Sequence, residues 1–283
     1  MIPILAKPKA ARPGISAAAS QSIRFYGTGN NDIDRFKVLV NNTAIEANIG
    51  NTDITVEFWI RTTAGNTANP INAQADTTWT LGNIIYDRDQ FAQVPGHGIS
   101  LGDGRVAFGL DTVNGARTIV GLSDVRNSAW HHIAATRVFS SGAMTLYVDG
   151  ARESLNAGPT GNLQYPNGAV PQNLCGPSGN QPCTFSDPYL VCGAEKHDAD
   201  PSFPSFFGYF TELRLSTVIR YTGASFAVPT ARFVNDASTA ALYHFFEGAG
   251  SVVADDSGNG NPGFLSIGGP SNGPTWETLS PFP

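Results

Sequence analysis

The chain has 283 residues, which is enough for one large all-β domain or two smaller domains. Hydrophobic residues make up 41% and charged residues only 14%, so the chain can bury a core under a surface rich in uncharged polar residues. Its formal net charge of −6 argues against nucleic acid and anionic membranes as partners, because neither is attracted to an acidic protein.

The first twenty residues read as a separate segment. Pro3, Pro8 and Pro13 exclude a continuous helix there. The apolar stretch 2–6 is too short for a signal peptide and precedes the basic residues instead of following them. No apolar run of the chain approaches the roughly 18 residues of a membrane span. We expect residues 1–20 to be an extended N-terminal arm, either a disordered tail or an arm that docks on a neighbouring subunit, and residues 21–283 to form one domain.

Alternating apolar residues predict most of the strands. In the segment 54–62 the apolar side chains occupy alternate positions from Ile54 to Ile60, which is the period of a strand. Similar patterns predict strands at 22–26, 36–40, 81–87, 98–101, 105–110 and 117–121. The irregular stretches 63–80 and 153–188 are expected to be long loops, and loops of such length are usually functional or disordered.

Residues 128–150 carry the clearest pattern. Two alternating segments, 130–139 and 144–149, flank a turn of Ser140, Ser141 and Gly142, and therefore predict a hairpin. Further strands are predicted at 189–194, 207–216, 240–246 and 263–267. With no helical pattern of convincing length, the sequence predicts an all-β protein.

The hairpin also resembles a known family. Its Trp-His-His-Ile-Ala and Leu-Tyr-Val-Asp-Gly strands resemble the central hairpin of laminin-G-like domains of the concanavalin A-like class, and 52–62 and 207–216 are similar to the early and late strands of that family. This resemblance implies an antiparallel two-sheet jelly-roll sandwich that binds or displays, often with calcium at its rims. The segment 241–265 resembles one that often opens bacterial members, but here it follows the late strand, which leaves the strand order near the C-terminus open.

Two groups of oxygen-bearing side chains are candidate metal ligands. The first lies in a Gly-rich segment and comprises Asp255, Asp256, Ser257, Asn259 and Asn261. Its spacing resembles the first half of an EF-hand loop, but position twelve is Ser266 instead of Glu, so it is either a different Ca²⁺ loop or a turn capped by its own side chains. The second is Asp87 and Asp89, which share one face at a strand end and could instead pair with Arg88.

Other residues suit a carbohydrate, because aromatic rings stack on sugars and polar groups bind hydroxyls. These candidates lie in or beside the predicted loops: Trp79, Tyr165, Phe203, Phe206, His197 and Asp198. The alternative is that the rings cap the ends of the sandwich. Cys175 and Cys183 flank a Gly- and Pro-rich loop, and the sequence leaves open whether they form a disulfide or stay reduced. Cys192 lies in an apolar run and is expected to be a buried free thiol.

Catalysis lacks its usual signature. Retaining glycosidases need two carboxylates about 5–5.5 Å apart, but the chain has no Glu-x-Asp-x-Glu run, and no Gly-x-Ser-x-Gly elbow marks a hydrolase nucleophile. The sequence therefore predicts a non-catalytic binding or display protein, such as a virion decoration or fibre component that binds glycans or neighbouring subunits. The alternatives are a secreted or cell-surface bacterial adhesion lectin and, third, a glycan-cleaving enzyme.

Overall fold

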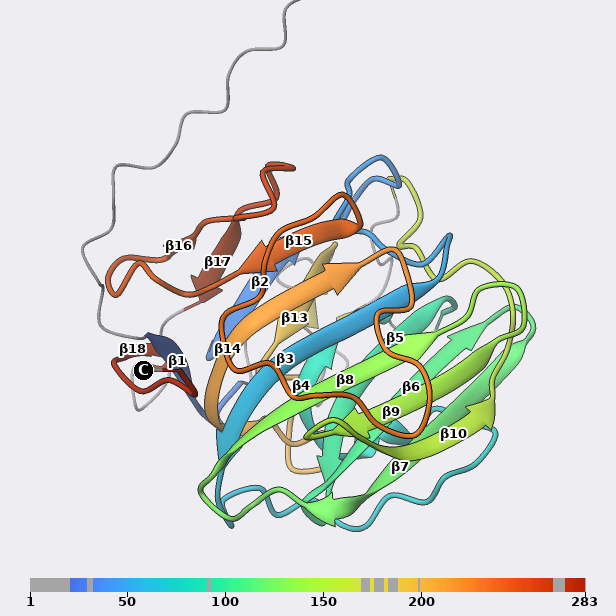
Figure 1. Ribbon diagram of the computed structural model, residues 1–283, viewed down its shortest axis with the longest axis horizontal. Coiled ribbons are helices and arrows are strands. Elements are labelled where there is room, and N and C mark those ends of the chain that lie inside the picture. The colour runs from blue at the N-terminus through green and yellow to red at the C-terminus, as the bar shows by residue number, and fades with distance from the viewer. Residues whose placement is uncertain are drawn as a thin grey trace, which may run out of the picture.

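A computed structural model describes residues 21–29, 33–90, 93–168, 174–175, 181–182, 188–197, 199–266 and 273–282. Two antiparallel sheets stack face to face, and the described residues contain no α-helix (Figure 1). The predicted all-β, two-sheet sandwich is therefore confirmed. The N-terminal arm, Asp198 and Cys183 lie outside the described residues.

The first sheet is built around the predicted central hairpin. Its strands run in the order β10 (Ala151–Ala157), β9 (Ala143–Val148), β8 (Trp130–Arg137), β3 (Ile54–Thr62), β14 (Phe207–Ser216), β1 (Ser22–Tyr26) and β18 (Thr275–Glu277). The C-terminal half of β14 pairs with β15 (Thr239–Tyr243) instead of β1. A bulge in β14 separates the two halves, where Glu212 has a positive φ of 55°.

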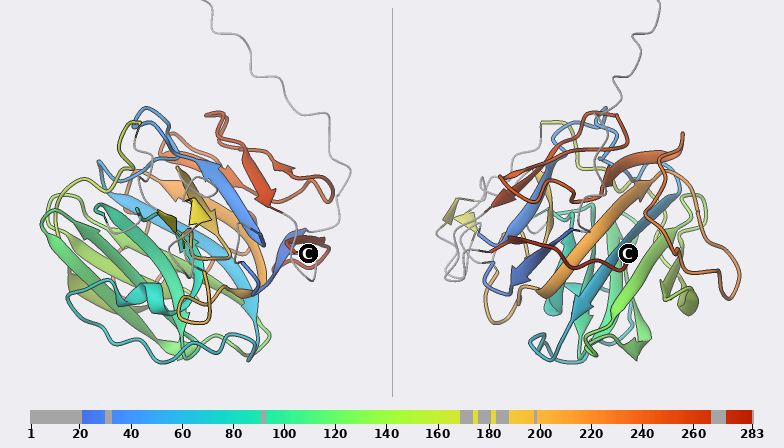
Figure 2. Two further views of the ribbon diagram at one scale, coloured as in Figure 1. Left: turned by 180° about the vertical axis from the view of Figure 1, so that it is seen from behind. Right: turned by 60° about the vertical axis from the view of Figure 1, so that its left-hand side comes forward.

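The second sheet lies behind the first in the view of Figure 1 and faces the reader in the left panel of Figure 2. Its strands run in the order β16 (Val252–Val253), β17 (Gly263–Ser266), β2 (Arg35–Leu39), β13 (Tyr189–Cys192), β4 (Asn83–Asp87), β5 (Gly96–Gly102), β6 (Arg105–Thr112) and β7 (Gly115–Asp124). A separate small hairpin joins β11 (Leu174–Cys175) to β12 (Gln181–Pro182). The segment 241–265 thus contributes to both sheets and closes the sandwich, which settles the strand order that the resemblance left open.

The core fills the space between the sheets. Alternate residues of the central strands point inward, as for Phe58 of β3 and Phe210 of β14, whose ring centres lie 5.1 Å apart. Cys192 is also fully buried there as a free thiol, as predicted, and burial raises its pKa well above the usual range.

A loop also covers the outer face of each sheet. Over the second sheet, Trp79 in a short 3-10 helix, η2 (Thr78–Leu81), packs on Ile84 and Ala107. Its indole stands on two glycines, since a Cβ at Gly98 or Gly109 would lie 2.0 Å from the ring. The space that the Trp79 side chain fills therefore exists because these two residues have no side chain.

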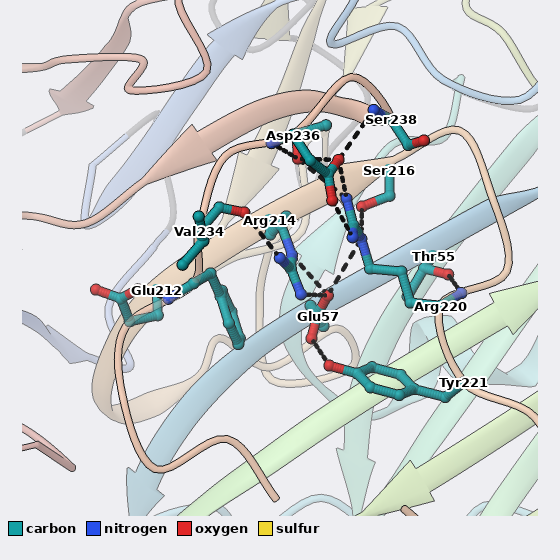
Figure 3. A network of polar contacts seen from close by, with 12 residues as sticks. Thr55, Glu57, Glu212, Arg214, Ser216, Arg220, Tyr221, Val234, Asp236 and Ser238 are labelled. Carbon is teal, nitrogen blue, oxygen red and sulfur yellow. Dashed lines mark hydrogen bonds and ion pairs between the residues drawn. The ribbon is translucent and has the colours of Figure 1, made fainter.

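Over the first sheet, the segment 217–238 is fastened by a polar network centred on Glu57 (Figure 3). The fully buried Glu57 carboxylate accepts hydrogen bonds from Arg214 Nε at 2.8 Å and the Tyr221 hydroxyl at 2.6 Å, and His132 Nε2 lies 3.1 Å away. Burial alone would raise the pKa of Glu57, but the His132 hydrogen bond and the Arg214 charge lower it below its usual value. Glu57, on the outer face of β3, is thus paired beneath a loop, whereas Arg61 farther along the same face is half-exposed.

Candidate functional site

Polar side chains meet where β4 ends at the rim of the second sheet. The fully buried Asp87 accepts hydrogen bonds from the backbone N–H of Asp89 at 2.9 Å and of Lys196 at 3.0 Å. Lys196 Nζ in turn donates to the carbonyl of Asp89 at 2.7 Å. Asp87 therefore joins the end of β4 to the segment that follows β13, and holds Asp89 beside that segment.

The result is a cluster of three metal-binding side chains, Asp89, Glu195 and His197, whose donor atoms all lie within 4.8 Å of one another. His197 Nδ1 is 3.4 Å from Asp89 Oδ1 and 3.2 Å from Glu195 Oε1. Burial raises the pKa of Asp87 and Asp89, and neighbouring carboxylates add to the shift. A bound cation would offset this repulsion, so these three side chains could hold a metal ion.

A cleft of about 570 Å³ opens beside this cluster. It lies on the outer side of the second sheet and is lined by Thr77, Trp79, Thr80, Asp89, Gln90, Gln93, Val94 and Asp111. Within the part of the chain that the structure describes, the buried Gln90 Oε1 has no hydrogen-bond partner. Because buried polar atoms are normally paired, the cleft has hydrogen-bonding capacity to offer a ligand.

Asp111 brings a second carboxylate to the cleft. Gly96 separates it from Asp89, since a Cβ at Gly96 would lie 2.6 Å from Asp111 Oδ1 and 3.1 Å from Asp89 Cβ. Burial, and then the charge of Asp89, raise the pKa of Asp111 to about 6. The cleft is therefore acidic, and its charge changes as Asp111 ionises near pH 6.

Comparison with known proteins agrees with this architecture. A family model described as the concanavalin A-like lectin/glucanases superfamily, of the laminin-G type, matches residues 37–216, which is more than half of the chain. The chain belongs to this superfamily. No curated protein matches this laminin-G-like chain.

Two solved structures are similar to this chain at low sequence identity. A proposed carbohydrate-binding protein from Bacteroides ovatus is 14% identical with a TM-score of 0.52, and the match covers 93% of this laminin-G-like chain and 60% of that protein. The LG4-5 domains of the mouse laminin α1 chain are 16% identical with a TM-score of 0.47, over 83% of this chain and 53% of theirs. The chain thus spans little more than half the length of these proteins.

No helix among the residues described here is long and apolar enough to cross a membrane.

The laminin-G-like fold brings together only part of the predicted site. Asp89 and His197 meet, but the expected stacking rings do not lie open. Trp79 is 1% exposed and Tyr165 and Phe206 are fully buried, while Phe203 is half-buried. Tyr165 instead lies under the rim, where Lys196 Nζ is 5.1 Å from its ring centre. These rings differ from our expectation because Tyr165 and Phe206 join the core between the sheets, while Trp79 packs against the outer face of the second sheet.

The segment 255–261 lies elsewhere, against β15. Asp255 accepts hydrogen bonds from four N–H groups, those of Leu242, Ser257 and both the backbone and side chain of Asn261. Asn259 Nδ2 donates to the carbonyls of residues 239 and 240. Asp256 also lies in this turn, outside the β4 rim. In this conformation the oxygens of Asp255 serve to close the turn.

Glu195 and Asp111 are site residues that the sequence analysis did not single out. Glu195 precedes His197 by two residues, and this i, i+2 spacing was the available signal. Asp111 pairs with Gly96 across the β5–β6 hairpin, so the register of that hairpin would have placed it beside the rim. The disulfide prediction stays untested, because nothing is described of the Cys175 side chain or of Cys183.

Proposed function

We propose that this chain binds carbohydrate without cleaving it, in the cleft beside β4, and holds a divalent cation at the edge of that cleft. One observation carries the proposal: Asp89 belongs both to the cleft lining and to the cluster with Glu195 and His197. A cation on these side chains would lie beside any occupant of the cleft.

The lining matches sugar chemistry. Carboxylates and amides accept and donate hydrogen bonds to hydroxyl groups, and here Asp89, Asp111, Gln90 and Gln93 supply them. A cation at the cleft edge would add a ligand position for a sugar hydroxyl. Membership of the lectin/glucanase superfamily and the likeness to the Bacteroides protein support the same assignment.

The donor set also bears on the metal. Ca²⁺ takes six to eight hard oxygen ligands, whereas an imidazole ligand suits Zn²⁺ better. Since His197 is one of the three donors, we propose a transition metal at this cluster, with Ca²⁺ as the weaker competitor.

The decisive experiment compares wild type with Asp89→Asn on a glycan array and by calorimetry with Mn²⁺, Zn²⁺ and Ca²⁺. We expect wild type to bind glycans and metal, EDTA to abolish glycan binding, and Asp89→Asn to weaken both by about tenfold or more. Asp103→Asn is the matched control, because it removes the same charge at an exposed turn.

Two results would contradict the proposal. Unchanged metal and glycan binding by Asp89→Asn would exclude the cleft. Release of reducing sugar ends from a bound glycan, lost in Asp111→Asn, would favour the second candidate, a glycosidase. That candidate has one observation behind it, the pairing of Asp89 with Asp111 in the cleft and the raised pKa of Asp111.

The setting is also a proposal. A laminin-G-like binding fold suits an outer surface, and we propose that of a virion or of a bacterial cell, with residues 1–20 as the segment that attaches one copy to the next.

A further inference from the structure

The outer face of the first sheet carries a row of arginine and aromatic side chains. Arg24 of β1 pairs with Tyr209 of β14, Tyr209 pairs with Arg61 of β3, and Arg61 pairs with Trp130 of β8. These four strands are neighbours in the sheet (Figure 1). Directly paired residues share a face, so the four side chains form one continuous row across the sheet.

The rings hold the arginines in place. Tyr209 lies between the two guanidinium groups, with Arg24 Cζ 5.5 Å and Arg61 Cζ 5.8 Å from its ring centre. Tyr26 lies 4.7 Å from Arg24 Cζ, and Trp130 packs against Tyr209 at 6.4 Å. All of these side chains are half-exposed. Stacking on a ring leaves the edge of a guanidinium free to donate hydrogen bonds.

The charge of this row is unmatched. Arg126, Arg214, Arg220 and Arg232 all form ion pairs with carboxylates. Among the described residues neither Arg24 nor Arg61 has such a partner, although acidic residues outnumber basic ones by 23 to 17. Other described arginines, such as Arg105 and Arg152, also have none, but Arg24 and Arg61 are the two that share a ring between them. Two arginines held on either side of one ring, without a carboxylate, therefore keep hydrogen-bond donors for a carboxylate from elsewhere.

We propose that the row of Arg24, Tyr209, Arg61 and Trp130 is a docking surface for a protein partner, through a segment with one or two carboxylates among apolar residues. Arginine, tyrosine and tryptophan are the residues that dominate binding energy at protein interfaces. Adjacent strands are about 4.8 Å apart, so two arginines separated by one strand can each take one carboxylate of an extended segment.

Two other occupants fit less well. The chain's own residues 1–20 contain Lys7, Lys9 and Arg12 but no acidic residue, so their charge does not complement the row. A sulfated polysaccharide needs many cationic contacts, whereas the row offers two and the molecule as a whole would repel a polyanion.

Labelled nonapeptides of leucine and serine with zero, one, two or three glutamates test this surface by fluorescence anisotropy. We expect affinity to rise up to two glutamates, and the double variant Arg24→Gln/Arg61→Gln to lose at least about tenfold. The double variant Arg24→Lys/Arg61→Lys should bind with intermediate affinity, because it keeps the charge without the planar fork. Arg105→Gln/Arg152→Gln, which removes the same charge at two exposed arginines, should bind like wild type.

Three outcomes would overturn the inference. These are affinity independent of glutamate content, an equal loss in the Arg105/Arg152 control, and dextran sulfate binding through Arg24 and Arg61 while the peptides fail to bind. EDTA should leave peptide binding unchanged, so the result is independent of the cation and carbohydrate site.

Discussion

At the scale of single residues, Asp111 couples the cleft to pH. Its pKa is raised to about 6 by burial, whereas in the unfolded chain it ionises near 4. Between these values the folded chain binds more protons than the unfolded one, so this residue makes the free energy of unfolding fall as pH rises. Its destabilising effect is complete above pH 6 and absent below pH 4.

Replacing Asp111 with Asn should therefore stabilise the protein in a pH-dependent way. We expect the melting temperature of Asp111→Asn to exceed that of wild type by about 1–3 °C at pH 7, and the gain to disappear near pH 4. Circular dichroism melts across this range give the measurement, with Asp103→Asn at an exposed turn as the control for loss of one charge. A gain of equal size at pH 4 and pH 7 would show that ionisation of Asp111 is not its cause.

At the scale of elements, the sequence predicts strands well where one face is buried. Alternation identified β3, β8 and β14, whose inner faces fill the core. It missed β10, because that strand's mostly exposed side chains carry no apolar alternation, and it missed β16 and β18, which have only two and three residues. The alternation of apolar and polar residues arises because one face of a strand is buried, so an exposed or very short strand shows little alternation in the sequence.

The site was harder to predict than the strands. Asp89 and His197 carried a local signal, but their meeting depends on β4 lying beside β13, which no local pattern reveals. Trp79 was expected to be exposed because it lies in a long polar loop. Its burial depends on Gly98 and Gly109, which belong to two other strands and leave room only when β5 and β6 pair.

The packing of Trp79 against Gly98 and Gly109 can be tested by mutation. Gly109→Ala should displace the indole and η2 from the second sheet, and lower the free energy of unfolding by about 1–3 kcal/mol in urea titrations. In a Trp79→Phe background, with a smaller ring, the same substitution should cost less. Equal costs in both backgrounds would mean that the added methyl group meets something other than Trp79.

At the scale of the whole molecule, the proposed role of residues 1–20 predicts the state of association. Light scattering after size-exclusion chromatography should give the mass of several chains for the full protein. Once residues 2–20 are removed, it should give the mass of one chain, which is below the 29.9 kDa of the full-length chain. The melting temperature of the shortened chain controls for misfolding. A single-chain mass for both proteins would remove the support for assembly through this segment.

The covers on the two sheets differ in what they leave open. On the second sheet the loop carrying Trp79 leaves the acidic cleft beside β4 open, while on the first sheet, which the segment 217–238 covers, Arg24 and Tyr209 remain half-exposed. In a sandwich the outer faces of the two sheets look in opposite directions. A sugar chain bound in the proposed cleft would therefore leave the proposed docking row accessible, and a single copy with both sites occupied would link two larger bodies.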